Sequence, residues 1–402
     1  MSRLACPETF PAPARRPQLL LLAGEHSGDQ QAARLVRGLR EQRPDWHIAA
    51  WGGPAMEEAG AELIYDLTQA AVVGLVEVLQ NYGYFRQLFD RLLAWIREHR
   101  PEAICLVDYP GLNLRLAEAL RKEGLSRQGG GAIPVYYYIA PQVWAWKKKR
   151  RFRMARTLDA LAVIFPFEEE VFADTSLPTT FVGHPFVAEG GESPVQEDPG
   201  GPLLLLPGSR RQAVNRILPI LLAAYRTYRE KTVDPVSAVI LYPDESLRTL
   251  LESMLGQDEW QTIRSLVSLQ RHDKKVSGSA VLTSSGTMSL RCALSGLPGR
   301  IVYRAHPVTW WIGRRIVSIA WLGMSNLLLQ KPMYPEFLQG EARPGVLAGE
   351  IEAMLKDPFI REQTEADAAA LRGLLQRPDG GGVVNWLLDQ MAVHQPEAGR
   401  QR

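Results

Sequence analysis

A loop with acidic and hydroxyl side chains follows the first apolar run of the chain. The run Leu19–Ala23 predicts a buried strand and Gly28–Arg40 has helical spacing, so Gly24–Asp29 forms the turn between them. Glycines let the backbone of such a turn approach a ligand, and free N–H groups at the helix start favour oxygen-rich groups. A tight turn in which Ser27 caps the helix is the alternative.

A second acidic turn stands at Val107–Asn113. Asp108 follows the strand predicted for Ala103–Val107, and the chain then turns into a helix predicted for Leu112–Lys122. A carboxylate in this position suits a general base, because burial can adjust its pKa. An aspartate that only caps the following turn is the alternative.

The second half of the chain repeats this arrangement with cationic and hydroxyl residues. A guanidinium stands at the start of the helix predicted for Arg211–Arg229, and small hydroxyl residues precede the helix predicted for Met288–Ser295. Helix dipole, free N–H groups and guanidinium together suit a diphosphate. Surface turns with an exposed arginine are the alternative. The candidate contacts are Gly208, Ser209, Arg210, Ser285, Gly286 and Thr287.

Basic and aromatic residues are interleaved in residues 144–156. They are Trp144, Trp146, Lys147, Lys148, Lys149, Arg150, Arg151, Arg153 and Arg156. Such a mixture could lie on an anionic membrane surface or on RNA, and a solvated face is the alternative. Residues 306–329, which contain Trp310, Trp311 and Trp321, lack the uninterrupted length of a membrane span. They predict either an interfacial element or a buried helix.

The elements that must position these residues form two similar series. Further strands are predicted at 46–51, 135–139 and 161–165 and, after a break, at 203–206, 238–242, 280–283 and 301–303, with another helix at 84–99. This alternation predicts an α/β fold of two Rossmann-like domains, each with a parallel sheet covered on both faces, and a cleft between them. The expected boundaries are a disordered tail at 1–17, a first domain at 18–188, a linker at 189–201 and a second domain at 202–355.

Composition narrows the class of function. The chain has 402 residues and a net charge of +2, so no overall field draws it to nucleic acid. Its three cysteines cannot all be paired, which fits a reducing compartment, and its seven histidines show no metal-ligand spacing. No metal and no cofactor are therefore expected. The first apolar run is too short for a signal peptide or a membrane span, so a cytoplasmic location is expected.

Taken in order, the motifs resemble those of the bacterial lipid-A-disaccharide synthases, a family of inverting glycosyltransferases with the two-Rossmann B-type fold. The resemblance extends from about Gln18 to near Leu388. Its motifs are AGEHSGD (23–29), AVVGLVEVL (71–79), VDYPGLN (107–113), YYIAPQVWAW (137–146), FPFE (165–168), VGHP (182–185), LLPGSR (205–210), SSGT (284–287), SNLL (325–328) and PEFLQ (335–339).

This resemblance implies a reaction and its setting. The donor would be UDP-2,3-diacylglucosamine and the acceptor 2,3-diacylglucosamine 1-phosphate, joined as a β-1′,6 disaccharide with release of UDP in lipopolysaccharide biosynthesis. Because both substrates carry acyl chains, peripheral association with the inner membrane is implied, through Trp144, Trp146, Lys147 and Lys148. A homodimer is also implied, as are C-terminal helices in residues 356–402 that pack back on the first domain.

Residue roles follow from the same resemblance. Asp108 would take the proton of the acceptor hydroxyl, with the Glu25 carboxylate beside it. Ser27, Gly28, Asp29 and Asn113 would lie on the acceptor side. Arg210 and the helix start after Gly208 would neutralise the departing UDP, so that no metal is needed. Asn326, Glu336 and Gln339 would lie on the donor side.

Three positions depart from the family pattern. The family has a small residue where His26 stands, often Glu where Ala213 stands, and usually Glu at the position of Arg291, whose guanidinium cannot accept hydrogen bonds from ribose hydroxyls. Alternatives to the synthase are therefore a diverged UDP-sugar enzyme, such as another transferase or a 2-epimerase, and a non-catalytic lipid or nucleotide-sugar binder. The VDYPGLN and APQVWAW motifs argue against the former, and the retained Asp108 and Arg210 against the latter.

Overall fold

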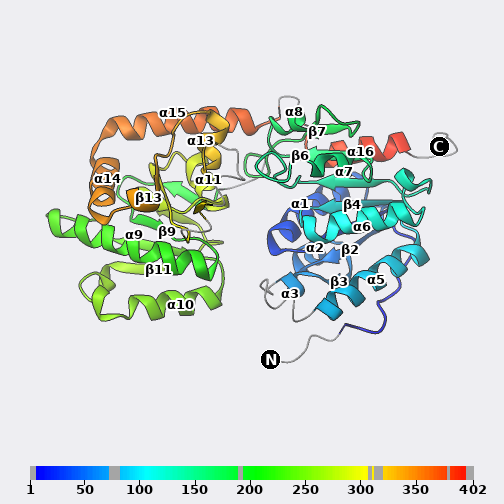
Figure 1. Ribbon diagram of the computed structural model, residues 1–402, viewed down its shortest axis with the longest axis horizontal. Helices are drawn as coiled ribbons and strands as arrows, with labels where there is room; N and C mark the ends of the chain where they lie inside the picture. Colours follow the sequence, from blue (N-terminus) through cyan, green and yellow to red (C-terminus); the bar gives the residue numbers. More distant parts are fainter. Residues whose placement is uncertain are drawn as a thin grey trace. The chain divides into compact units, whose positions relative to one another are not determined.

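The computed structural model describes residues 6–71, 82–188, 193–306, 310–311, 320–377 and 381–394. Most of the AVVGLVEVL motif and part of the 306–329 stretch lie outside these ranges. The chain divides into two compact units, one of residues 1–188 with 376–402 and one of residues 189–375. Both units are built around a parallel sheet (Figure 1).

Unit 1 contains a seven-stranded sheet in the order β3-β2-β1-β4-β5-β6-β7. Its strands are β1 Leu19–Ala23, β2 Ile48–Gly52, β3 Glu62–Asp66, β4 Ala103–Val107, β5 Val135–Tyr138, β6 Ala160–Val163 and β7 Thr179–Phe181. Its helices are α1 His26–Gln42, α2 Pro54–Glu58, α3 Thr68–Ala71, α5 Tyr82–His99, α6 Pro110–Lys122, α7 Arg150–Ala155, α8 Glu168–Phe172 and α16 Val383–His394, with a 3-10 turn at Arg127–Gly129.

Both faces of this sheet are covered, as the apolar runs predict. Leu20 and Leu22 of β1 pack into one core with α5 and α6, whereas Leu19 and Leu21 pack into another with α1 and α16. Because successive side chains of a strand point to opposite faces, a fully apolar strand needs helices on both sides. The strand order reverses direction between β1 and β4, which makes their carboxyl ends the switch point of the sheet.

Unit 2 contains a six-stranded sheet in the order β11-β10-β9-β13-β14-β15 and a two-stranded sheet of β8 and β12. Its strands are β8 Val195–Glu197, β9 Leu203–Leu206, β10 Ala238–Tyr242, β11 Val267–Arg271, β12 Val276–Gly278, β13 Ala280–Thr283, β14 Gly299–Tyr303 and β15 Glu336–Leu338. Its helices are α9 Arg211–Lys231, α10 Glu245–Leu255, α11 Thr287–Leu294, α13 Met324–Leu329, α14 Pro344–Lys356 and α15 Pro358–Leu375, with 3-10 turns at Asp258–Trp260, Arg264–Leu266 and Gln339–Glu341.

One face of the larger sheet packs on α9, α10 and α14. Helix α11 contacts β13, β14, α13 and α15. The order again reverses between two central strands, here β9 and β13, so the switch point of unit 2 lies at their carboxyl ends. The predicted α/β class, with two Rossmann-like units, is confirmed.

The N-terminal segment differs from the disordered tail expected for residues 1–17. Residues 6–17 lie along unit 1, where the Phe10 ring packs edge-on against Trp51 at 4.5 Å between centroids. The Trp95 indole Nε1 donates a hydrogen bond of 2.9 Å to the Pro11 carbonyl. A proline-rich segment forms no helix or strand of its own, but its aromatic side chain buries apolar surface against the core.

The expected linker and C-terminal segment also differ from the structure. Part of the 189–201 segment forms β8, which pairs with β12 in parallel register inside unit 2. Within 356–402, α15 belongs to unit 2, and only α16 packs on unit 1. Trp386 of α16 packs edge-on against Tyr136 of β5, whose hydroxyl donates to the Gln390 carbonyl at 3.0 Å. The family resemblance implied that the chain returns to the first unit from residue 356, whereas in the structure it rejoins unit 1 from residue 376.

Candidate active site

Asp108 and Glu25 flank the switch point of unit 1. Ala23, the last residue of β1, pairs in register with Val107, the last residue of β4, so Glu25 and Asp108 both follow the carboxyl ends of neighbouring strands. Ligand sites in parallel sheets form at this position because loops there leave the sheet in opposite directions. The predicted placement of both carboxylates at strand ends is therefore confirmed.

The backbone at Asp108 is held in an unusual conformation. Asp108 and Tyr109 both have φ of +47°, in the left-handed region that non-glycine residues rarely occupy. Two donors hold the Asp108 carbonyl, the Tyr137 hydroxyl at 2.5 Å and the Asn113 Nδ2 amide at 2.7 Å. The Asp108 N–H donates to the Tyr138 carbonyl at 2.9 Å. Such conformations persist only where surrounding contacts fix them, and they concentrate at functional sites.

The Asp108 carboxyl has an altered proton affinity. Burial, followed by the negative charge of Glu25, raises its pKa to about 6, while a backbone hydrogen bond from Tyr109 acts in the opposite direction. A carboxyl with this pKa is ionised near neutral pH and is still basic enough to accept a proton. Burial thus shifts the pKa of Asp108 in the direction that suits a general base.

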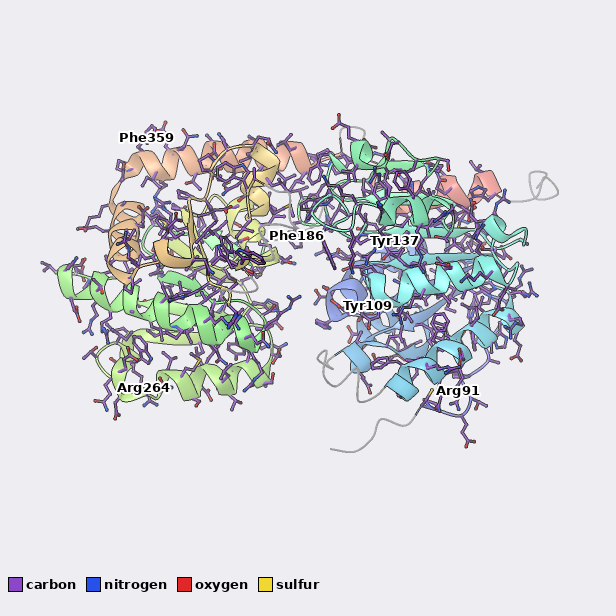
Figure 2. All side chains as sticks on the ribbon, in the orientation of Figure 1. Arg91, Tyr109, Tyr137, Phe186, Arg264 and Phe359 are labelled. Atoms are coloured by element: carbon purple, nitrogen blue, oxygen red, sulfur yellow. The ribbon has the colours of Figure 1, made fainter. Side chains whose placement is uncertain are left out.

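Gly24 has a role that differs from the expected approach to a ligand. A Cβ atom at Gly24 would lie 2.1 Å from Cδ1 of Tyr109, so the tyrosine ring occupies the space directly over this glycine. The labelled rings of Tyr109 and Tyr137 both belong to unit 1 (Figure 2). The Gly24 turn and the Asp108 turn are thereby packed together at the switch point.

The structure gives Asp29 another role than the one expected, and it rules out Ser27 as the cap of α1. Asp29 is fully buried, and its carboxylate accepts hydrogen bonds from the N–H groups of Gly53 at 2.9 Å and Ala55 at 3.0 Å. It fixes the start of α2 and is not open to a substrate. Ser27 does not cap α1, because that helix begins at His26 with Glu25 as its N-cap residue and no side-chain capping bond. The Ser27 side chain is exposed.

Asn113 is a positioning residue for Asp108 and not a surface contact. Its side chain is fully buried, and its Nδ2 amide donates to the carbonyls of Val107 and Asp108. Gly28 is also buried, and a Cβ there would meet Ala23 and the Val107 carbonyl only at ordinary contact distances of 3.6 and 3.7 Å.

In unit 2, two turns meet at the switch point. Leu206 of β9 pairs in register with Thr283 of β13, and the Ser284 N–H donates to the Leu206 carbonyl at 2.8 Å. Gly208 has φ of +112°, and a Cβ there would lie 3.2 Å from the Ser284 hydroxyl. This glycine is required by both its conformation and the closeness of the second turn.

The helix starts after these turns carry free N–H groups. Neither α9, with Arg210 at its N-cap, nor α11, with Gly286 at its N-cap, has a side-chain capping bond. Ser209, Arg210, Gly286 and Thr287 are exposed, and no described atom lies within 4 Å of a Cβ built on Gly286. Two uncapped helix starts on adjoining strands form a suitable place for an anionic group.

Asn326, Glu336 and Gln339 instead brace the neighbouring loops. The buried Asn326 amide bonds to both the N–H and the carbonyl of Tyr334, at 2.8 and 2.7 Å. The Glu336 carboxylate accepts from the N–H groups that precede α13, including that of Gly323 at 2.8 Å. Gln339 bonds to the Ala305 backbone through both its oxygen and its nitrogen. The contacts of Asn326 are therefore internal, whereas the donor-side role expected for the partly buried Glu336 and Gln339 stays a prediction.

Comparison with known proteins now identifies the family. The family described as lipid-A-disaccharide synthetase matches residues 19–372. The lipid-A-disaccharide synthase of Trichlorobacter lovleyi is 34% identical over 387 residues, covering 92% of this chain and 96% of the relative. That of Geobacter sulfurreducens is 33% identical, covering 88% and 92%, and that of Coxiella burnetii is 32% identical, covering 89% and 94%. The chain belongs to the lipid-A-disaccharide synthase family.

Solved structures support the fold of this lipid-A-disaccharide synthase family member. A putative UDP-N-acetylglucosamine 2-epimerase from Listeria monocytogenes aligns with a TM-score of 0.62 at 14% identity, covering 97% of this chain and 99% of that one. The calicheamicin glycosyltransferase CalG4 aligns with a TM-score of 0.54 at 13% identity, covering 95% and 100%. At these identities the likeness establishes the glycosyltransferase B-type fold and nothing finer.

The comparisons do not favour the alternatives raised by Arg291. The family match extends across this position, and the three relatives named above are synthases. Arg291 lies in α11 partly buried, and its carbonyl accepts from the Ser295 hydroxyl at 3.0 Å. The substitution is therefore accommodated inside the helix of a member of this family.

The basic and aromatic stretch is partly exposed. Trp146 is 43% exposed, and the Lys147 ammonium lies 4.4 Å from its ring centroid. Lys147 and Lys148 are exposed. Trp144 is partly buried, and its ring packs edge-on against Phe167 at 5.3 Å. In the second stretch, Trp311 is 59% exposed.

Two residues whose contacts shape unit 1 carried no clear signal in the sequence. Tyr137 donates to the Asp108 carbonyl, yet nothing in their spacing relates these two residues. Glu168 of the FPFE motif is 1% exposed and accepts from the Phe165 N–H at 3.1 Å, and burial raises its pKa to about 8. In the sequence, Glu168 follows an apolar strand by a few residues, where a glutamate usually lies in solvent at the start of a helix. Its burial could therefore not be predicted.

Among the described residues, no group of three or more His, Cys, Asp or Glu side chains is arranged to hold a metal ion. No helix in the described part of the chain combines the length and apolar character that crossing a membrane requires.

Proposed function

We propose that the protein transfers 2,3-diacylglucosamine from UDP-2,3-diacylglucosamine to 2,3-diacylglucosamine 1-phosphate, forming the β-1′,6-linked disaccharide and UDP. The family assignment supports the reaction type. The observation that carries the proposal is the Asp108 carboxyl, which is fixed at the switch point of unit 1 with a pKa raised to about 6.

In the proposed mechanism, Asp108 is the general base. The acceptor 6-hydroxyl attacks the anomeric carbon of the donor, and its proton passes to the Asp108 carboxylate as the new C–O bond forms. The bond between that carbon and the β-phosphate oxygen breaks on the opposite face, which inverts the configuration. The left-handed backbone at Asp108, fixed by Tyr137 and Asn113, keeps the carboxylate from turning away from the acceptor.

The leaving group is proposed to bind unit 2. Departing UDP gains negative charge on its β-phosphate, and the N–H groups at the starts of α9 and α11 would donate to it. Arg210 would add a permanent positive charge beside the same point. The support is geometric, since Gly208 and Ser284 bring these two turns together.

Peripheral binding to the inner membrane is proposed through the exposed part of the basic stretch. Trp146 can enter the interface between headgroups and acyl chains, while Lys147 and Lys148 face anionic headgroups. Both proposed substrates carry acyl chains, so they reside in such a surface. Vesicle sedimentation of Trp146→Ser with anionic phospholipid vesicles tests this, with weaker binding as the expected result.

The reaction is tested by measuring UDP release in detergent micelles that contain both substrates, without added metal. We expect release that depends on the acceptor, together with a disaccharide product. UDP-N-acetylglucosamine in place of the acylated donor is the control and should give no release. UDP release without acceptor, or substrate binding with no release at all, would contradict the proposed transfer.

A further inference from the structure

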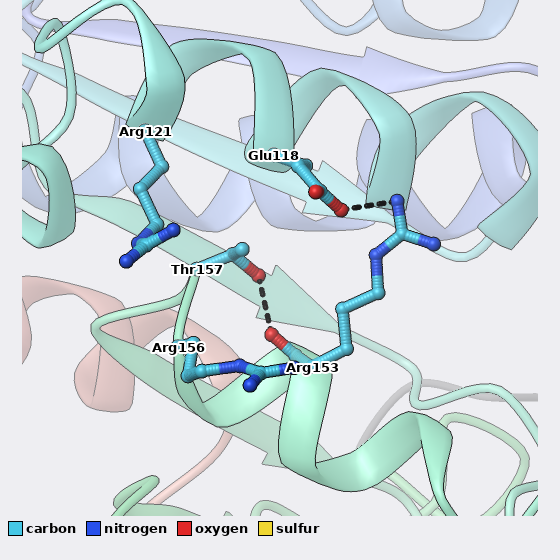
Figure 3. A pocket seen from close by; sticks show the side chains of 5 residues that line it. All are labelled: Glu118, Arg121, Arg153, Arg156 and Thr157. Atoms are coloured by element: carbon cyan, nitrogen blue, oxygen red, sulfur yellow. Dashed lines mark hydrogen bonds and ion pairs between the residues drawn. The ribbon is translucent and has the colours of Figure 1, made fainter.

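A pocket of about 390 Å³ lies on unit 1 between α6 on one side and α7 with the residues that follow it on the other. Glu118 and Arg121 line it from α6, and Arg153, Arg156 and Thr157 line it from the other side (Figure 3). This volume lies within the range of sites for small organic ligands. Three guanidinium groups and one carboxylate give the lining a net positive charge.

The carboxylate of this pocket is already neutralised. Glu118 forms an ion pair with Arg153 and a second, at 3.2 Å, with Lys122 one turn along α6. The carboxylate of Asp159, two residues after Thr157, accepts from the Val135 N–H at 2.7 Å. It lies 4.0 Å from the Arg127 guanidinium. The acidic groups near the pocket are thus committed to other partners.

Two guanidinium groups of the pocket remain uncompensated. Within the described part of the chain, the side chains of Arg121 and Arg156 have neither an ion pair nor a hydrogen bond to another residue. The Thr157 hydroxyl donates to the Arg153 carbonyl at 3.1 Å, so its proton is not offered to the pocket. The available donors are therefore the two guanidiniums, whose planar forks match the oxygens of a phosphate group.

The pocket is separate from the Asp108 site. Helix α6 starts at Pro110, beside Asp108, and Glu118 lies eight residues further along it. At about 1.5 Å per residue, this places the pocket roughly 12 Å or more along the helix from the switch point. Thr157 precedes β6, on the amino side of the sheet, whereas Asp108 follows β4, on the carboxyl side.

We propose that this pocket, the Arg121 pocket, is a second binding site for a phosphate group carried by a small polyol. The volume exceeds that of inorganic phosphate alone and leaves room for the esterified group. Phe152 of α7 is 42% exposed, next to Arg153, so the ligand chemistry fits both a soluble sugar or glycerol phosphate and a phospholipid headgroup. A bound anion would relieve the repulsion between the two unpaired guanidiniums.

The test compares two double variants of the full-length protein. Arg121→Gln with Arg156→Gln removes both free guanidiniums of the pocket. Arg37→Gln with Arg264→Gln removes the same charge from exposed positions on α1 and on the Arg264–Leu266 turn, which are remote in sequence from the pocket. Binding of glycerol 1-phosphate and of inorganic phosphate is measured by calorimetry at low salt.

We expect glycerol 1-phosphate to bind the wild type and the control variant equally and the pocket variant at least tenfold more weakly, with UDP release unchanged in all three. Inorganic phosphate should bind more weakly than the ester but with the same order among variants. Equal binding by both double variants, or no binding by the wild type, would overturn the proposal. If the glutamine variant fails to fold, Arg121→Lys with Arg156→Lys keeps the charge and loses the fork, and several-fold weaker binding is expected.

Vesicles distinguish the two sources of the phosphate. Phosphatidylcholine vesicles with and without phosphatidylglycerol are sedimented with each variant. Weaker sedimentation of the pocket variant than of the control variant identifies the headgroup of a phospholipid as a ligand. Equal sedimentation, together with the loss of glycerol 1-phosphate binding, identifies a soluble phosphate ester. Both results support the site, since each requires the pocket to bind phosphate.

Discussion

Glu25 acts electrostatically on Asp108 across the junction of β1 and β4. The two carboxylates follow strands whose last residues, Ala23 and Val107, are paired in register. Burial is the larger cause of the raised Asp108 pKa, and the negative charge of Glu25 is the second. Glu25 is exposed, so its effect on Asp108 can be removed without opening the core.

The pH dependence of the transfer reaction tests this relationship. The value of kcat/KM is expected to rise with pH and to level off above about 6, as the Asp108 carboxyl of the free enzyme loses its proton. Glu25→Gln removes one cause of the raised pKa and leaves burial, so the rising limb should move to lower pH. The measurement is the pH profile of kcat/KM for both proteins.

The difference between the pH profiles of the two proteins is more informative than either profile alone. The reason is that a phosphate monoester such as the acceptor also titrates near pH 6. The acceptor contributes equally to both profiles, whereas the Asp108 contribution moves. The separation of the profiles should shrink as salt is added, since Glu25 is exposed to solvent. Superimposable profiles at low salt would show that Glu25 does not act on the group that limits the rate.

Replacing Asp108 should separate activity from stability. Asp108→Asn keeps the shape of the side chain but cannot accept the proton, and a loss of about 10²–10⁴ in kcat is expected. The pKa of Asp108 is raised on folding, so ionisation costs the wild type stability as pH rises from the unfolded value of 3.8 to about 6. Above pH 6 the variant should therefore be more stable, by up to about 3 kcal/mol.

Urea unfolding at pH 4 and pH 8 measures this second effect. The stability advantage of Asp108→Asn should be present at pH 8 and nearly absent at pH 4, where the wild-type carboxyl is protonated in the folded state. Acceptor binding should change little. Near-normal turnover of the variant would reject the role of Asp108 as base.

The parts of the fold that the sequence predicted are those fixed by local pattern. Ala103–Val107, Leu203–Leu206 and Ala280–Thr283 are strands with the predicted bounds, because an apolar run that ends in a turn is a local signal. Asp108 was placed correctly for the same reason, since it follows such a run directly.

The residues that were misplaced depend on partners that are distant in sequence or hidden by it. Asp29 caps a helix 24 to 27 residues away, through Gly53, Ala55 and Met56, and no spacing within its own motif indicates this. Asp108 and Tyr109 have left-handed backbone conformations, but neither is a glycine, so the sequence does not indicate these conformations. A motif can indicate that a residue is important for the site. Only the structure shows whether its side chain is open to a ligand or is hydrogen-bonded to neighbouring residues.

The buried Glu168 should make the free energy of unfolding depend on pH between about 4.5 and 8. Burial raises its pKa from 4.5 to about 8, so the wild type loses stability as pH rises between these values. Glu168→Gln keeps the size and removes the ionisation. Its stability relative to the wild type should grow from pH 5 to pH 8 and stay constant above, as measured by urea unfolding. A difference that is independent of pH would mean that Glu168 is not buried as a titrating group.

Two glycines of unit 2 should respond differently to the same substitution. Gly208→Ala puts a Cβ at φ of +112° and 3.2 Å from the Ser284 hydroxyl, so a loss of stability of about 1–3 kcal/mol is expected. Gly286→Ala meets no described atom within 4 Å and has φ of 162°, an extended conformation that alanine adopts without strain. Its stability should equal that of the wild type.

UDP binding then decides whether the open space at Gly286 is used. If the β-phosphate lies against the start of α11, the added methyl group of Gly286→Ala occupies its place, and UDP affinity should fall about tenfold or more in a fully folded protein. Calorimetric titration with UDP measures this, and thermal unfolding confirms the fold. The two proteins differ by a single methyl group. If Gly286→Ala binds UDP as tightly as the wild type, the start of α11 does not contact the phosphates, and the start of α9 with Arg210 must bind them.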